Sequence, residues 1–212
     1  MRIAAMKWSA VPVALLMAAG MGMAQSTGSS TTSTQSSSGP VVHQRKEKQQ
    51  ERIGNGVQSG QLTAGETANL EHKEAAINHE TRVDRAANGG KLTSSEKQQI
   101  NQQQNHVSSQ IYRDKHNANT AHYGNTEVGQ RRGNQQARIA QGVGSGQLTA
   151  GETAHLENRE RRTNQQIHAD RQANGGRLTP GERAQVNHEQ NRTSRQIYRA
   201  KHNGRRQGKA KP

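Results

Sequence analysis

Large apolar residues are sparse in this chain, but from about residue 50 onward their spacing is that of helices. Ile53 and Val57 are four residues apart and Leu70 and Ile77 are seven apart, so each pair falls on one face of a helix. Each apolar stripe is only one residue wide, which predicts thin cores. We therefore expect an all-α fold of tandem helix-loop-helix repeats. The predicted helices lie near residues 43–57, 64–87, 94–116, 130–143, 150–173 and 180–202.

Most of these helices have the same start signal, a Thr followed three residues later by a Glu. In such a capping box the Thr hydroxyl accepts a hydrogen bond from a first-turn N–H, and the Glu carboxylate accepts one from the N–H of the Thr. Pro180 supports one boundary independently, because proline is favoured at the first helical position. The four boxes are Thr63/Glu66, Thr93/Glu96, Thr149/Glu152 and Thr179/Glu182.

A duplication organises the chain. Residues 44–117, the first segment, recur as residues 130–203, the second segment, displaced by 86 positions. Each segment carries Gly-x-Leu-Thr-x-x-Glu twice, 30 residues apart, and periods of this size are typical of tandem supersecondary repeats. We therefore expect two three-helix copies. They are flanked by a disordered Ser/Thr/Gln-rich linker at 25–43, a linker at 118–129 and a basic tail at 204–212.

The first 24 residues have the pattern of a secretory signal peptide. Arg2 and Lys7 precede a short apolar run, and Gly22 and Ala24 supply the small residues of a cleavage site. The alternative is a buried N-terminal helix, but the rest of the chain has little apolar surface to receive one. The apolar run is also shorter than the ~20 residues of a transmembrane helix. We expect a periplasmic or secreted protein, cleaved near Ala24, without a transmembrane segment in its mature form.

Composition narrows the class of function. Hydrophobic residues make up 28% of the chain, there is no Cys, and 30 Lys and Arg stand against 16 Asp and Glu, giving a formal net charge of +14. So little apolar material disfavours a preorganised catalytic pocket, and thiolate chemistry and disulfides are excluded. We expect a non-enzymatic protein with no catalytic residues. The positive charge indicates polyanions as partners, whereas the few aromatic residues argue against sequence-specific nucleic-acid recognition.

Each Gly-x-Leu-Thr-x-x-Glu loop resembles the EF-hand calcium loop, which has Gly, an aliphatic residue and Glu at positions 6, 8 and 12. In the first loop these are Gly60, Leu62 and Glu66. Most oxygen ligands expected at positions 1, 3 and 5 are missing, and position 1 of the second loop is Arg85. The whole pattern is similar to uncharacterised exported bacterial proteins with degenerate EF-hand-like repeats, a likeness that implies no established activity. We expect no cofactor, with calcium kept as an alternative.

The candidate site is the motif Gln-Ile-Tyr-Arg-x-Lys-His-Asn that closes each segment. Its cations stand at a predicted helix end, where positive charge also complements the helix dipole, so helix termination and solubility are the simpler interpretation. The sharper hypothesis is contact with a polyanion, continued by the arginines of the tail. No His pair has the spacing that chelates a metal across one helical turn, and we assign no metal ligands. The predicted contact residues are Arg113, Lys115, His116, Arg199, Lys201, His202, Arg205 and Arg206.

These observations predict an envelope interaction or binding module for anionic polymers. Two alternatives remain. The first is a calcium-binding protein with EF-hand-like loops. The second is a periplasmic holdase-type chaperone, because thin amphipathic helices expose apolar stripes to a client.

Overall fold

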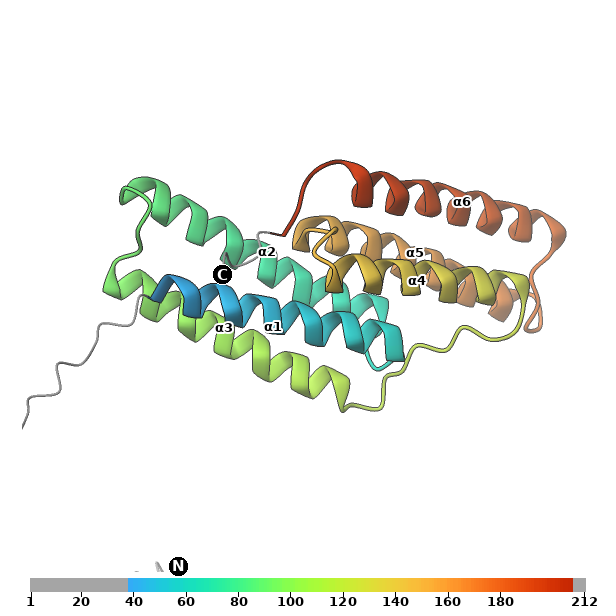
Figure 1. The fold of residues 1–212 in the computed structure, drawn as a ribbon. Coiled ribbons are helices and arrows are strands. Elements are labelled where there is room, and N and C mark those ends of the chain that lie inside the picture. Colours follow the sequence, from blue (N-terminus) through green and yellow to red (C-terminus); the bar gives the residue numbers. More distant parts are fainter. Residues whose placement is uncertain (1–37, 208–212) are drawn as a thin grey trace, which may run out of the picture. The chain divides into compact units, whose positions relative to one another are not determined.

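The computed structural model describes residues 38–207, which form six helices and no strand (Figure 1). The prediction of an all-α fold is confirmed. The predicted signal peptide, most of the N-terminal linker and the last five residues of the tail lie outside the described residues. The helices are α1 (Ser38–Ser59), α2 (Ala64–Ala87), α3 (Ser94–Lys115), α4 (Glu127–Gly144), α5 (Ala150–Ala173) and α6 (Pro180–His202).

The helix boundaries differ from the predicted ones mainly at two starts. Helix α1 begins at Ser38, inside the segment assigned to the linker, and Pro40 lies in its first turn, where a missing N–H is tolerated. Helix α4 begins at Glu127 because Thr126 caps it: the Thr126 hydroxyl accepts from the Gly129 N–H at 3.2 Å. This Thr lacks a Glu three residues later, so it does not have the capping-box pattern of the other starts.

All four predicted capping boxes are present. In each, the Glu carboxylate accepts from the backbone N–H of its Thr, at 2.9 Å for Thr63, 2.7 Å for Thr93, 3.0 Å for Thr149 and 2.8 Å for Thr179. The boxes therefore fix where α2, α3, α5 and α6 begin.

The loop after α1 is held by one glycine and one leucine. The Leu62 N–H donates to the Gly56 carbonyl at 3.0 Å, and a Cβ on Gly56 would lie 2.7 Å from the Leu62 side chain. Gly142 and Leu148 make the same contact after α4, with a hydrogen bond of 2.9 Å. The close approach of leucine to helix explains why glycine stands at both positions.

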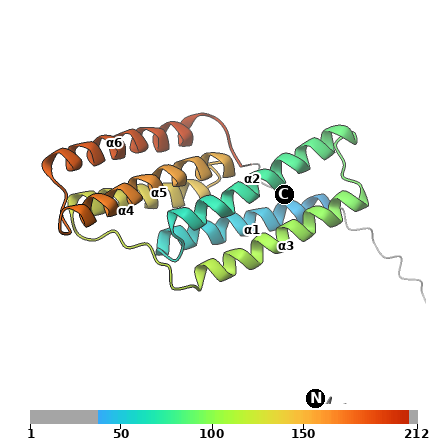
Figure 2. The ribbon, with the colours of Figure 1, turned by 180° about the vertical axis from the view of Figure 1, so that it is seen from behind.

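The helices contact one another both within and between the two segments. Helices α1, α2 and α3 pack together, as do α4, α5 and α6, and in addition α1 packs against α4 and α2 against α5 (Figures 1 and 2). At the α1–α4 contact a Cβ on Gly54 would lie 3.3 Å from the Ala140 carbonyl oxygen, so glycine lets these helices approach closely. Because the packing between the segments is so extensive, the division into two three-helix copies stays a prediction.

Buried amides supply much of what the sparse apolar core lacks. The Gln49 amide donates to the Gln104 carbonyl at 2.7 Å and to the Ser108 hydroxyl at 3.0 Å, and the Gln104 amide donates to the Val42 carbonyl at 2.9 Å. These bonds join α1 to α3, and Gln135 and Gln190 repeat them between α4 and α6. Glutamines that sequence patterns treat as surface residues are therefore core residues here.

Four glutamates are buried on α2 and α5: Glu71, Glu74, Glu157 and Glu160. Burial raises the pKa of Glu157 to about 8 and that of Glu74 and Glu160 to about 7, and it also raises the pKa of Glu71 well above its ordinary value. The charge of Glu157 adds to the shift of Glu71, so these two carboxyls are close enough to repel across the α2–α5 contact. Each accepts one amide hydrogen bond, Glu71 from Gln50 at 3.0 Å and Glu157 from Gln136 at 2.9 Å.

Candidate functional site

The predicted contact residues of the first segment lie at the end of α3. The ring of Tyr112 stacks on that of His116 with centroids 4.2 Å apart, and the Nδ1 atom of His116 lies 2.7 Å from the Tyr112 carbonyl oxygen. Arg113 is exposed and Lys115 is half-buried. The Asn117 amide, the last residue of the motif, donates to the Glu66 carboxylate at 2.7 Å. This bond ties the end of α3 to the start of α2, so part of the motif is structural.

The end of α6 repeats this arrangement. Tyr198 and His202 stack at 4.2 Å, and the Asn203 amide donates to the Glu152 carboxylate at 2.6 Å. Lys201 donates to the Gln141 side chain at 2.8 Å, while Arg199 is exposed. At both helix ends the predicted cations lie around the hydrogen bond between Asn and Glu. None of these helix-end cations lines the hollow between α1, α2 and the start of α5.

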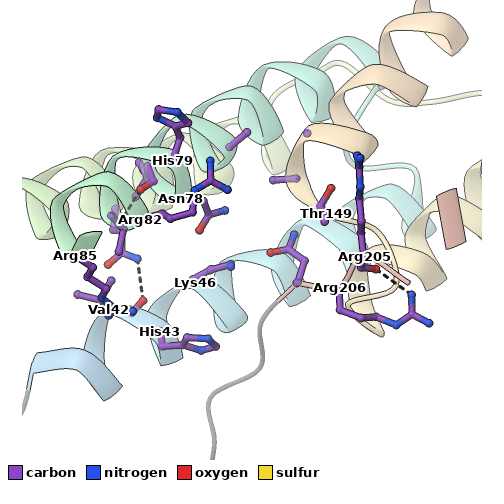
Figure 3. A pocket seen from close by; sticks show the side chains of 17 residues that line it. Val42, His43, Lys46, Asn78, His79, Arg82, Arg85, Thr149, Arg205 and Arg206 are labelled. Carbon is purple, nitrogen blue, oxygen red and sulfur yellow. Dashed lines mark hydrogen bonds between the residues drawn. The ribbon is translucent and has the colours of Figure 1, made fainter. Parts of the chain in front are cut away.

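Arg205 and Arg206 lie in the chain beyond α6. The Arg206 guanidinium donates to the Arg205 carbonyl at 2.9 Å and back to the Lys201 carbonyl, in the last turn of α6, at 3.4 Å. The Gln207 N–H donates to the Gly146 carbonyl at 3.0 Å, and the Gln207 amide donates to the Gln50 side chain at 2.8 Å. These two bonds hold Arg205 and Arg206 at the rim of a hollow of about 680 Å³ bounded by α1, α2 and the start of α5 (Figure 3).

The lining of this hollow is strongly basic. It includes Lys46 from α1, Arg82 and Arg85 from α2, and the two tail arginines, together with His43 and His79, but no Asp or Glu. Arg82 and Arg85 lie on one side of the hollow and Arg205 and Arg206 on the opposite side, with Lys46 between them (Figure 3). We call this site the basic hollow.

Burial shifts the pKa values of the charged groups beneath the basic hollow. It lowers the pKa of Lys46, which the nearby carboxyl of buried Glu74 partly offsets. Burial together with the charge of Lys46 also lowers the pKa of His43, whose ring lies 3.7 Å from the Glu47 carboxylate. Burial raises the pKa of Glu74 to about 7, so near neutral pH this carboxyl compensates the cations above it only in part.

The corresponding place in the second segment is filled. Tyr123, in the connection between α3 and α4, lies against the first turns of α4, where Gly129 and Gly133 leave room for it. A Cβ on Gly129 would fall 1.8 Å from the Tyr123 carbonyl oxygen, and Arg132 lies over the Tyr123 ring at 5.2 Å from its centroid. Burial raises the pKa of Tyr123 to about 12. We call this place the tyrosine seat.

A second side chain also fills the second-segment counterpart. Arg161 extends across to the start of α2, where its Cδ would lie 3.2 Å from a Cβ on Gly65. The residue 86 positions earlier is Ala75, and a Cβ on Gly151, at the matching start of α5, meets nothing within 4 Å. Alanine at position 75 therefore helps to leave the basic hollow open.

Of the eight predicted contact residues, the basic hollow contains Arg205 and Arg206 only. Sequence reasoning missed Lys46, Arg82 and Arg85, which the fold brings to them. The three-residue spacing of Arg82 and Arg85 is the one sequence signal that could have placed them on a shared helix face, but no local pattern could place that face beside the tail.

The EF-hand-like loops use their glutamates as caps. Although burial opposes it, hydrogen bonds from the Thr63 backbone and from Asn117 hold the pKa of Glu66 below its ordinary value. The carboxylate of Glu96 likewise accepts from the Thr93 N–H and from Asn88. Within residues 38–207 no group of three or more His, Asp or Glu side chains is arranged to hold a metal ion.

Comparison with family models, curated proteins and solved structures finds no match to this chain. None of the helices in the described part of the chain is long and apolar enough to cross a membrane.

Proposed function

We propose that the protein is a non-enzymatic, exported binding module for anionic polymers of the cell envelope, and that the basic hollow is its principal contact. The observation that carries this proposal is that five Lys and Arg residues line one hollow, and that no described residue of its lining is an Asp or Glu. Such a concentration of one charge attracts polyanions and raises their local concentration. Export is supported by the charged and apolar pattern of residues 1–24.

A binding role fits the hydroxyl groups of the hollow. Its two threonines already donate their hydroxyl protons elsewhere: Thr149 to the Glu152 carboxylate at 2.8 Å and Thr81 to the Ile77 carbonyl at 2.7 Å. The Glu152 carboxylate is a weak base because, although burial opposes it, hydrogen bonds from the Thr149 backbone and from Asn203 hold its pKa below the ordinary value. The arginines, by contrast, present planar donors suited to oxyanions.

Two charge-matched variants test which surface makes the contact. One changes Arg82, Arg85, Arg205 and Arg206 to Gln. The other changes Arg113, Lys115, Arg199 and Lys201 to Gln, which removes the same four charges at the helix ends. Both are applied to immobilised heparin and eluted with a salt gradient, with the mature chain as reference.

We expect the basic-hollow variant to elute at clearly lower salt than the helix-end variant, because converging cations release more counterions than scattered ones. Circular dichroism of both variants checks that the helices are intact. Equal elution of the two variants, or a larger loss in the helix-end variant, would show that the basic hollow is not the principal contact. A mature chain that does not bind heparin at low salt would contradict the proposed function itself.

A further inference from the structure

The basic hollow offers two separate sets of cations rather than one. Arg82 and Arg85 lie one helical turn apart on α2, and Arg205 and Arg206 are consecutive residues beyond α6, on the opposite side (Figure 3). A compact anion can contact only one of the two sets. At the tail set the Glu152 carboxylate is the nearby counter-charge: although burial opposes it, its pKa is lowered by hydrogen bonds from Thr149 and Asn203 and further by the charge of Arg205.

Building on the proposed function, we infer that the basic hollow holds a chain of at least two linked phosphate groups, one at Arg82 and Arg85 and the next at Arg205 and Arg206. Lys46, between the two sets, contacts the link between the groups. Neighbouring cations of like charge repel one another, and a ligand with anionic groups at both sides relieves this repulsion throughout the hollow.

Phosphate suits this lining better than carboxylate. A guanidinium binds two phosphate oxygens at once, and each phosphate offers further oxygens to a second donor, whereas a carboxylate has only two. The start of α5 also faces the hollow through Thr149, Ala150 and Gly151. A helix N-terminus adds positive potential for an anion, which the capping carboxylate of Glu152 offsets in part here. Gly151 leaves open space there, because no atom lies within 4 Å of the place its Cβ would take.

The walls of the basic hollow come from both segments. Lys46, Arg82 and Arg85 belong to the first, while Thr149 belongs to the second and the tail arginines follow it. A phosphate chain bound between them connects α2 to the start of α5 and to the tail. Binding therefore stabilises the packing of the two segments and raises the melting temperature of the whole protein.

A ligand series of increasing length tests the inference. Binding of orthophosphate, pyrophosphate and tripolyphosphate to the mature chain is measured by calorimetry and by thermal melting at constant ionic strength. We expect affinity to rise at least about tenfold from orthophosphate to tripolyphosphate, because the second set of arginines is engaged only by a linked group.

Two half-site variants locate the two ends. In R82Q/R85Q and in R205Q/R206Q we expect tripolyphosphate to bind about as weakly as orthophosphate binds the unchanged protein. The control R113Q/K115Q removes two charges outside the hollow and should retain the full length dependence.

The inference is wrong if all three variants lose the same fraction of affinity, or if affinity shows no step with chain length. It is also wrong if a heparin oligosaccharide or an oligoglutamate of equal charge binds as tightly as tripolyphosphate. If the phosphate series fails but heparin retention still depends on the basic hollow, the proposed function stands and only the phosphate inference is wrong. If heparin retention does not depend on the basic hollow either, both the inference and the proposed function are wrong.

Discussion

The basic hollow and the tyrosine seat occupy corresponding places in the two segments, and within residues 38–207 the first is open while the second is filled. At the tyrosine seat, Gly129 and Gly133 admit Tyr123. The residues 86 positions earlier are His43 and Glu47, whose ring nitrogen and carboxylate lie 3.7 Å apart on α1. The same arrangement of helices thus packs against Tyr123 of the α3–α4 connection in the second segment, and exposes a charged surface in the first.

This comparison shows that a few positions decide between filling and opening. Ala75 stands where the second segment has Arg161. Arg205 and Arg206 stand 86 positions after Asn119 and Thr120, and the residue 86 positions after Tyr123 lies outside the described residues. One backbone hydrogen bond positions the segment after α3 and an equivalent one positions the segment after α6. The Ala121 N–H donates to the Gly60 carbonyl at 2.8 Å, and the Gln207 N–H donates to the Gly146 carbonyl at 3.0 Å. This hydrogen bond therefore places the two connecting segments alike, while the side chains that they carry differ.

The largest expected effect comes from closing the tyrosine seat. The variant G129A places a Cβ where the Tyr123 carbonyl oxygen lies, so the connection must move, and we expect the free energy of unfolding to fall by about 2 kcal/mol or more. Urea denaturation measures this loss. Ultraviolet titration of the three tyrosines should also show that the one with a pKa of about 12 now ionises at lower pH.

G133A is the matched control for that change. Its Cβ would meet the Tyr123 ring at an ordinary contact distance of 3.5 Å, and alanine favours helix over glycine. We expect stability to be unchanged or slightly increased. An equal loss in both variants would mean that α4 itself, and not the seated Tyr123, is what G129A disturbs.

A smaller effect on stability tests the contact between α2 and α5, which joins the two segments. The pKa values of Glu71 and Glu157 are raised in the folded chain, so both are neutral at low pH and cost free energy once they ionise. Stability from this source is full below about pH 4.5 and is lost as pH rises through the folded pKa values. The free energy of unfolding should therefore fall as pH rises from about 5 to the Glu157 pKa of about 8.

The variant E71Q/E157Q removes the part of that dependence that these two carboxyls cause, while Glu74 and Glu160, with pKa values of about 7, keep theirs. We expect it to exceed the unchanged protein by about 2 kcal/mol at pH 8 and by much less at pH 5, measured by chemical denaturation. The exposed Glu51 provides a control, since E51Q should follow the unchanged protein at both pH values. A parallel pH profile for E71Q/E157Q would show that these carboxyls are not the source.

The smallest effect comes from partly filling the basic hollow. The variant A75Q adds a long neutral side chain where the second segment has Arg161, without changing the charge. We expect tripolyphosphate to bind about threefold to tenfold more weakly, a difference on the order of 1 kcal/mol, with the melting temperature of the free protein nearly unchanged. Affinity equal to that of the unchanged protein would mean that the space beside Gly151 is not used.

Local signals predicted the helices well, because each start depends on residues three apart. Thr63 and Glu66 satisfy each other within one turn, and no distant contact is needed to place α2. The candidate site could be predicted only in part. Arg205 and Arg206 were identified as cations, but Lys46 looks like an ordinary surface lysine until α1, α2 and the tail are brought together.

The packing between segments was also beyond sequence patterns, for a physical reason. It depends on glycine and on buried polar groups, such as Gly54 at the α1–α4 contact and Glu71 between α2 and α5. Apolar periodicity reports none of these. The scarcity of large apolar residues predicted thin cores, and the buried glutamines show what takes their place.

The Glu66 carboxylate has a consequence for the order of folding. It accepts from Thr63, three residues away, and also from Asn117, 51 residues away. The near contact forms with the first turn of α2, whereas the distant one must wait until α3 has returned along the molecule, since long loops close more slowly. Glu152 makes the same pair of contacts with Thr149 and Asn203. In each segment, one carboxylate thus caps the start of a helix through a local contact and joins that start to the end of the segment through a distant one.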